Sequence, residues 1–358
     1  MPQTMQMAGV VFLSSDPRNM NRVLVPLELD GSMPLLGAQA HRLGGQTMGT
    51  TWQVLWAAAG ASRSEPVRLA VQEELDLVVA QMSTWLDGSD LDRFNRASAG
   101  TVHTVPEAMA EVLEAALWLA EVSAGAFNPA AGALVNLWGF GPSPRYTDPG
   151  FAPPTDGAVQ DALAFNDWRT LQWHAASRQL HQPGGMRLDF SAIAKGYAVD
   201  RVSRRLTRMG LTHTLVEVGG ELRGQGLRLG GQPWWVDLES PPAAQGQVPL
   251  PITRVALHGL SVATSGDYRR VYTHDGARWP HTIDPRQGRP LANGLASVSV
   301  LHPECMWADA WSTALTVLGR AQGMALATTH RIAALFVQRE PDGSLTETLT
   351  PALKELAG

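Results

Sequence analysis

The segment from Ser261 to Leu315 constrains the fold more than any other part of the chain. Within it, Asp275-Gly276 separates two runs of β-forming residues, Tyr268 to Thr273 and Arg278 to Ile283. Asp-Gly between such runs is the strongest short-range signal for a two-residue β-hairpin. A Pro-containing turn closed by glycine and a short strand come next, so the segment alternates tight turns with short strands before a helix begins.

That helix is predicted from Met306 to Gly319, and it carries Asp309 and Thr313 four positions apart. The spacing puts both side-chain oxygens on one face near the helix N-terminus. Two hard oxygen donors so placed are suited to a magnesium ion beside substrate phosphates. The alternative is that the aspartate only stabilises the helix through its dipole. Spacing alone favours this second interpretation.

Composition excludes several classes of protein. The chain has 358 residues, 44% of them hydrophobic and 17% charged, which is typical of a globular protein with a large core. A net charge of −5 without a basic cluster argues against a nucleic-acid-binding surface. No apolar run reaches the roughly 20 residues of a membrane-spanning helix. The single cysteine, Cys305, excludes an internal disulfide.

The order of predicted elements favours an α+β fold, because strands and helices segregate rather than alternate. Residues 1–45 show no clear period and are interpreted as an N-terminal extension, with one strand at Arg22 to Leu29. Residues 46–358 are predicted to form one compact domain of two closely packed halves, which opens with a strand at Gln46 to Ala57. The other predicted elements include helices at Pro66 to Trp85 and Pro106 to Ser123, a helix capped by Ser191 and ending near Gly210, and a loop over residues 142–157.

Several motifs follow one another in order after the first 45 residues. The first five are MGTTWQV from Met48, MSTWLDGSDLDRFNR from Met82, GAFNPAAGALVNLWGFGP from Gly125, LDFSAIAKGYAVDRV from Leu188 and LVEVGGELRGQG from Leu215. The C-terminal part adds TSGDYRRVY, HTIDPRQGRP and ADAWSTALTVLG. Each pattern alone is weak, but together, in this order, they are highly specific, and they resemble the ApbE family, the FAD:protein FMN transferases. The resemblance covers nearly everything after the first 45 residues.

The resemblance implies an FAD site. It places Met48 and Trp85 against the isoalloxazine ring, although the family usually has tyrosine at the position of Trp85. Lys195 and the amides of Ser265 and Gly266 are expected to hold phosphate oxygens. The complete set of FAD-contacting positions is Met48, Trp85, Ala126, Phe127, Asn128, Asp189, Lys195, Ser265, Gly266, Asp267 and Ile283.

The resemblance also implies a Mg²⁺ site and a catalytic histidine. The metal ligands are expected to be the backbone carbonyl of Ala192 and the side chains of Asp309, Ser312 and Thr313. His281 is the expected proton acceptor, because histidine readily takes a proton near neutral pH. Asp284, three residues later, either orients His281 or binds metal, and the sequence does not decide between these roles.

The reaction implied is cleavage of the FAD pyrophosphate with magnesium, followed by attachment of FMN through a phosphoester to a Ser or Thr of an acceptor flavoprotein subunit, with release of AMP. One alternative is a magnesium-dependent FAD pyrophosphatase, which would use water as acceptor. Another is a flavin-binding protein without chemistry. The Asp309/Thr313 pair and His281 argue against this last class, because binding alone needs no metal.

The sequence departs from the family at a few positions. Asn128 stands where aspartate is typical, Glu217 where asparagine is common, and Glu221 where aspartate follows Gly-Gly. An amide at residue 128 can donate as well as accept a hydrogen bond. The N-terminus lacks a basic n-region, an A-x-A-like site and the cysteine that many relatives use for lipid attachment. As written, the chain is expected to be cytoplasmic, or periplasmic if a leader is missing.

Overall fold

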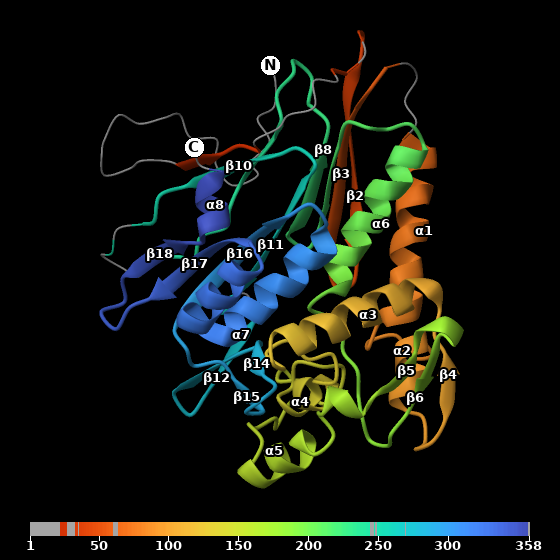
Figure 1. The fold of residues 1–358 in the computed structure, drawn as a ribbon, viewed down its shortest axis with the longest axis vertical. Coiled ribbons are helices and arrows are strands. Elements are labelled where there is room, and N and C mark those ends of the chain that lie inside the picture. The colour runs from red at the N-terminus through yellow and green to blue at the C-terminus, as the bar shows by residue number, and fades with distance from the viewer. Residues whose placement is uncertain are drawn as a thin grey trace.

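The computed structural model describes residues 22–26, 33–34, 36–59, 64–243, 247, 249–268 and 270–356. At its centre is an eight-stranded sheet in the order β18-β17-β16-β11-β8-β7-β3-β2, whose neighbouring strands all pair antiparallel (Figure 1). The strands are β2 (Gln39–Thr47), β3 (Thr50–Ala58), β7 (Thr214–Val218), β8 (Glu221–Gln225), β11 (Leu260–Gly266), β16 (Leu295–His302), β17 (Ala333–Arg339) and β18 (Leu345–Leu349).

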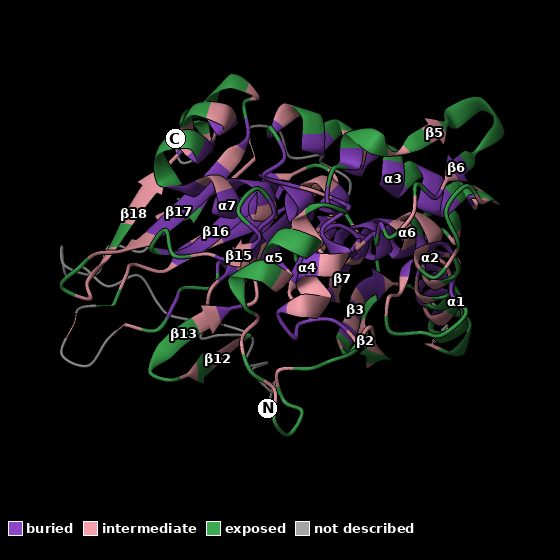
Figure 2. Cartoon of the chain, turned by 90° about the horizontal axis from the view of Figure 1, so that it is seen from below, coloured by how far each residue is buried: buried purple, intermediate pink, exposed green. Residues whose placement is uncertain are grey.

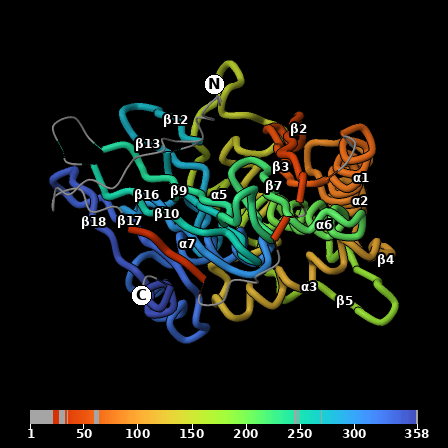
Figure 3. Tube along the Cα trace, turned by 90° about the horizontal axis from the view of Figure 1, so that it is seen from above, coloured from red at the N-terminus to blue at the C-terminus, as the bar shows by residue number. Residues whose placement is uncertain are grey.

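One face of this sheet is covered by three helices, α1 (Ser64–Met82), α6 (Ala194–Arg208) and α7 (Cys305–Thr329). In the view from above, α1 lies toward the β2–β3 end and α7 toward β16 and β17 (Figure 3). A fourth helix, α3 (Glu107–Val122), packs against α1 and α7. The apolar faces of these four helices and of the strands beneath them form the main core.

The other face of the sheet is covered by a three-stranded sheet, β1-β10-β9, made of β1 (Arg22–Leu24), β10 (Thr253–Leu257) and β9 (Trp234–Asp237). Apolar side chains from both sheets form a second core, which α8 (Pro351–Glu355) closes with Leu353. Strand β16 is therefore buried on both faces over almost its whole length (Figure 2).

Short elements complete the fold. They are α2 (Asp90–Asn95), β4 (Val102–Thr104), α4 (Gly132–Leu137), α5 (Asp156–Leu163), the 3-10 turns Trp168–Thr170 and Ala175–Ser177, β5 (Gln172–His174), β6 (Gln179–His181), the hairpin of β12 (Val271–His274) and β13 (Ala277–Pro280), and the pair β14 (Ile283–Asp284) and β15 (Arg289–Pro290). A third apolar cluster joins α4 and α5 to the β12–β13 hairpin. No helix in the described part of the chain is long and apolar enough to span a membrane.

The α+β fold and the Asp-Gly hairpin are confirmed. Asp275 and Gly276 both have positive φ, 49° and 76°, as a type I′ turn requires. The strand predicted at Gln46 to Ala57 forms as β3 from Thr50, but its predicted start is wrong, because the chain reverses at Met48-Gly49, with φ of 50° and 70°, and β2 and β3 form a hairpin. The boundary predicted at residue 45 falls inside β2. The strand predicted at Arg22 forms as β1, and residues 27–29 lie outside the described ranges.

Two helix boundaries also differ from the prediction. Helix α6 begins at Ala194 with Ile193 as its N-cap residue, so Ser191 is not the cap. Helix α7 has a non-helical residue at Gly319, with φ of 75°, where the predicted helix ends, and it continues beyond that residue to Thr329. The loop predicted over residues 142–157 extends only to residue 155, because α5 begins at Asp156.

Candidate active site

A cluster of oxygen atoms forms where α7 faces β11. The hydroxyl of Ser265 lies 2.7 Å from that of Ser312 and 3.0 Å from that of Thr313. Asp309 precedes Ser312 by three residues, and its side chain is also buried, with the residue 3% exposed. Helical spacing brings the α7 residues to one face, and the strand supplies the serine opposite them. The sequence-predicted residues Asp309, Ser312 and Thr313 therefore share one small region with Ser265.

The first turn of α6 holds the carboxylate of Asp309. The amide of Gly196 donates to Asp309 Oδ2 at 3.0 Å, and Lys195 Nζ lies 3.9 Å from Asp309 Oδ1. Lys195 also forms an ion pair with the buried carboxylate of Glu221. Two buried carboxylates thus lie near one lysine, and a cation bound there would be attracted by their ionised forms. Ala192 lies in the turn just before α6.

The donors in this cluster fit magnesium better than a softer metal. They are carboxylate and hydroxyl oxygens, which are hard ligands. Within the described ranges, no group of three or more His, Cys, Asp or Glu residues is placed to hold a metal ion. Magnesium commonly needs only one or two carboxylates, because waters and substrate phosphates complete its coordination. Asp309, Ser312 and Thr313, with the carbonyl of Ala192, are the residues that would hold it.

Strand β11 offers a main-chain donor beside the oxygen cluster. β8 pairs with β11 only at Leu260 to Val262, whereas β16 pairs with it as far as Gly266. The hydrogen bond from Asp267 N to Ala296 O, at 3.0 Å, fixes the alternation of the ladder. By that alternation the amide of Ser265 points to β16, and the amide of Gly266 points to the side without a paired strand. Of the two amides expected to hold phosphate, the ladder leaves that of Gly266 without a strand partner, although Gly266 itself is buried.

His281 lies just after β13, where its main chain and its ring both contact Arg270. Its ring nitrogen Nδ1 lies 3.1 Å from the carbonyl oxygen of Arg270, and its amide donates to the same oxygen at 3.0 Å. A carbonyl oxygen only accepts, so Nδ1 must carry the proton of this hydrogen bond. In the neutral ring, Nε2 then bears the lone pair. His281 is therefore set up to accept a proton at Nε2.

The carboxylate of Asp284 is used within its own turn. It accepts hydrogen bonds from the amide of Arg286 at 2.9 Å, from the guanidinium of Arg286 at 2.9 and 2.8 Å, and from the side chain of Gln287 at 3.1 Å. Asp284 is buried. These contacts support a role in shaping the turn that follows His281, and they favour neither of the two roles that the sequence left open.

The expected flavin-facing residues lie in two different environments. Met48 occupies the β2–β3 turn and packs against the main core. Trp85 is 49% exposed, and the guanidinium of Arg145 lies over its ring, 4.9 Å from the centroid. An exposed indole face of this kind is available for stacking on a flat ring.

Several other predicted FAD-contacting residues are already engaged in the protein. Phe127, with its neighbour Ala126, and Ile283 are buried, and the amides of Ala126 and Phe127 already donate to Ser123. Asp189 accepts from the amide of Ser191 at 2.7 Å, and Asp267 pairs with Arg278 at 2.7 Å.

The side chain of Asn128, at the position where the family has aspartate, both donates and accepts a hydrogen bond in this chain. Its side-chain nitrogen donates to the carbonyl of Asn166 at 2.8 Å, and its side-chain oxygen accepts from the amide of Ala130 at 2.8 Å. A carboxylate would lack the donor of the first bond. Asn166 in turn donates to the carbonyl of Pro285, which connects Asn128 to the turn after His281.

A cleft of about 270 Å³ lies between the segment that follows β13 and α7. Its lining includes Thr282, which follows His281, and Thr316, three residues after Thr313. Its charged lining residues are Asp267, Arg278 and Arg339. The cleft is therefore lined by sequence neighbours of the predicted proton acceptor and of the α7 oxygen cluster, and not by those residues themselves.

The sequence did not single out two residues that this geometry makes important. Glu221 was noted only as a departure from the family, yet it pairs with Lys195. Gly196 was noted only as part of a motif, yet it donates to Asp309. The one available signal for Gly196 was a glycine inside a helix, which usually marks a close approach of backbone.

Comparison with known proteins identifies the family. The model of the ApbE family matches residues 48–336. The chain belongs to the ApbE family. It is 35% identical over 309 residues to the FAD:protein FMN transferase of Vibrio cholerae serotype O1, covering 86% of this chain and 90% of that protein. It is 34% identical over 312 residues to the protein of the same name from Salmonella typhimurium, covering 86% and 87%.

Solved ApbE structures have the same fold. The apo form of the Pseudomonas stutzeri flavinyl transferase ApbE matches with a TM-score of 0.81 at 37% identity, covering 91% of this chain and 99% of that one. The flavin transferase ApbE from Vibrio cholerae also matches with a TM-score of 0.81, at 34% identity, covering 89% and 99%. The predicted family and fold class are therefore confirmed for this ApbE chain.

Proposed function

We propose that this chain is a magnesium-dependent FAD:protein FMN transferase. The observation that carries the proposal is the oxygen cluster of Asp309, Ser312, Thr313 and Ser265, which lies beside Lys195 at the start of α6. A carboxylate, several hydroxyls and a lysine at one place suit a bound metal and a pyrophosphate together. The names of the relatives support FAD as the substrate and a protein as the acceptor.

Each residue of the site has a proposed task. Bound at Ala192, Asp309, Ser312 and Thr313, magnesium would neutralise charge on the pyrophosphate. Lys195, the first turn of α6 and the amide of Gly266 would hold phosphate oxygens, since lysine and free amides at a helix N-terminus favour anions.

Proton transfer is assigned to His281. Its Nε2 would take the proton of a Ser or Thr hydroxyl on an acceptor flavoprotein subunit. The hydroxyl oxygen then bonds to the FMN phosphorus, the bond from that phosphorus to the oxygen bridging to AMP breaks, and AMP leaves. The cleft that Thr282 lines would take part of the ligand or acceptor, with His281 as the preceding residue of the chain.

Two alternatives use the same residues differently. An FAD pyrophosphatase would have the same metal ligands and pyrophosphate contacts, with water in place of the protein hydroxyl. A flavin-binding protein without chemistry would need neither the oxygen cluster on α7 nor a histidine oriented by a backbone carbonyl, so those features argue against it.

AMP release distinguishes transfer from hydrolysis. A protein hydroxyl held in line with the phosphorus reacts far faster than bulk water. We expect slow AMP release from FAD and magnesium alone, and a marked rise when a candidate acceptor subunit is added. Fast release without any acceptor, with no flavin attached to Ser or Thr, would instead identify a pyrophosphatase. An acceptor whose target Ser or Thr is replaced by alanine is the matched control.

A further inference from the structure

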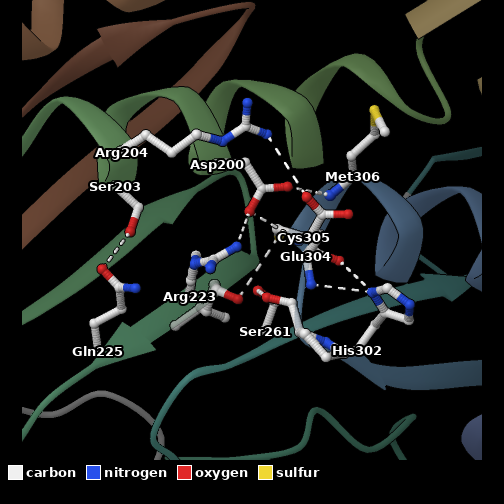
Figure 4. A network of polar contacts seen from close by, with 12 residues as sticks. Asp200, Ser203, Arg204, Arg223, Gln225, Ser261, His302, Glu304, Cys305 and Met306 are labelled. Atoms are coloured by element: carbon white, nitrogen blue, oxygen red, sulfur yellow. Dashed lines mark hydrogen bonds and ion pairs between the residues drawn. The ribbon is translucent and has the colours of Figure 1, made fainter. Parts of the chain in front are cut away.

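Helices α6 and α7 cap each other at their N-termini. Asp309, in the second turn of α7, accepts from the amide of Gly196 in the first turn of α6. Asp200, in the middle of α6, accepts from the amides of Cys305 and Met306 at the start of α7, at 3.0 and 2.8 Å (Figure 4). Each helix thus supplies the aspartate that satisfies unpaired amides of the other.

Asp200 is held in this place by a buried ion pair. Its exposure is 0%, and Arg223 of β8 pairs with its Oδ1 (Figure 4). Burying an ionised carboxylate is costly unless it is paired and hydrogen-bonded. The guanidinium and two amides meet that requirement, and the helix dipole of α7 adds to it. Cys305, beside it, is a packing residue, because burial raises the pKa of its thiol well above the ordinary value.

The contact fixes how α7 is rotated about its own axis. Successive residues of a helix are about 100° apart around the axis, so a turn by one residue would carry Asp309 away from the face it now presents. Asp200 anchors residues 305 and 306, and Asp309 lies one turn further along the same helix. The hydroxyls of Ser312 and Thr313 meet Ser265 only while this rotation is kept.

We propose that Asp200 is a positioning residue for the oxygen cluster of α7. Through the first-turn amides of α7, and with Arg223 holding its carboxylate, it sets the rotation that presents Asp309, Ser312 and Thr313 as metal ligands. The inference rests on the metal site of the proposed function. It assigns metal affinity to a residue that does not itself touch the metal.

The test uses Mn²⁺ as a paramagnetic substitute for magnesium. Mn²⁺ is titrated into the full-length protein, and binding is measured as the loss of the electron paramagnetic resonance signal of free Mn²⁺. Asp200→Ala removes both hydrogen bonds to α7, and Asp200→Asn keeps one acceptor oxygen. Supporting residues around metal sites typically contribute about 10–100-fold in affinity. We expect Mn²⁺ binding to weaken about 10-fold in Asp200→Asn and more in Asp200→Ala. If the alanine variant does not fold, the asparagine variant keeps the test measurable.

The matched control is Asp237→Asn. Asp237 is also an aspartate in an ion pair, with Arg254, and is partly buried, but it links β9 to β10 on the other side of the central sheet. Its loss should lower thermal stability and leave Mn²⁺ affinity unchanged. If Asp200→Asn binds Mn²⁺ as tightly as Asp237→Asn, the positioning role is overturned while the metal site stands. If the parent protein binds no Mn²⁺, the metal site itself fails, and the inference with it.

Discussion

At the scale of single residues, the carbonyl of Arg270 decides how His281 can act. Because Nδ1 donates to this oxygen, Nε2 is left as the proton acceptor, and the ring is held in one orientation. The sequence identified His281 as a candidate through its place before the Asp-Pro turn. It could not predict which ring nitrogen carries the proton, because the carbonyl partner lies 11 positions earlier, across the β12–β13 hairpin.

Replacing His281 should separate binding from chemistry. We expect His281→Ala to lose FMN transfer while FAD still binds, because general-base catalysis typically contributes about 10²–10⁴-fold in rate. The measurement is flavin attached to an acceptor, alongside FAD affinity by fluorescence titration. His274→Ala is the control, because His274 lies in the same hairpin and its ring pairs with the neighbouring Asp275. Undiminished transfer by His281→Ala would remove His281 from the mechanism.

Trp85 makes a second residue-scale prediction. Its ring is half exposed and already stacks with a flat cation, Arg145, so it can stack on the isoalloxazine as well. Trp85→Ala should weaken FAD binding by about 1–3 kcal/mol, the usual contribution of such stacking. Trp118, which is 46% exposed on α3, provides the matched control, and Trp118→Ala should bind FAD as the parent does. Equal affinity in Trp85→Ala would place the flavin elsewhere.

At the scale of elements, the contact between α6 and α7 depends on the missing side chain of Gly196. A Cβ there would lie 2.3 Å from the carbonyl oxygen of Cys305, which is closer than nonbonded atoms approach each other. Alanine in place of glycine within a helix normally stabilises by about 0.5–1 kcal/mol. Here the two helices would have to separate, and the bond from Gly196 to Asp309 would be lost with their contact.

We therefore expect Gly196→Ala to lower the melting temperature and to weaken metal binding, against the ordinary trend for helices. Gly157→Ala is the control, because Gly157 lies in α5 and its Cβ would meet no atom within 4 Å. That substitution should stabilise slightly. Thermal unfolding of the two variants decides the matter, and a Gly196→Ala protein as stable as the parent would contradict the close packing described for α6 and α7.

Elements were predictable from sequence where local chemistry is strong. Asp275-Gly276 is the preferred pair for its turn, and the helices α1 and α3 have clear apolar periods. The β2–β3 hairpin was missed, because methionine is rarely found at positive φ and gives no turn signal at Met48. Strand β2 also contains Gly44 and Gly45, which are poor strand formers, so its own propensity hides it.

At the scale of the whole molecule, the site is assembled from segments far apart in the sequence. Lys195 meets Glu221 across 26 positions, and Ser265 meets Thr313 across 48. The motifs named Asp309, Ser312, Thr313 and Ser265 as site residues, and the structure places the hydroxyls of Ser312 and Thr313 against Ser265, while the roles of these residues stay predictions. They could not predict the capping of α7 by Asp200 from 105 positions away, because only tertiary packing brings the two helices into contact.

The layered fold also explains why the oxygen cluster can be rigid. α7 packs on β11 and β16, and a second sheet covers the opposite face of these strands, so the strand that carries Ser265 is supported from both sides. Ligands held on such elements keep their geometry better than ligands on loops. The proposed transfer of FMN to a protein depends on this supported cluster.

The most direct test is mass spectrometry of an acceptor flavoprotein subunit after incubation with this protein, FAD and magnesium. We expect the acceptor to gain the mass of one FMN less one water on a Ser or Thr, with AMP as the second product. Neither Asp309→Ala nor the parent in chelator should produce this gain, because one lost carboxylate leaves the metal only neutral protein ligands. An unmodified acceptor, or equal modification by Asp309→Ala, would contradict the account.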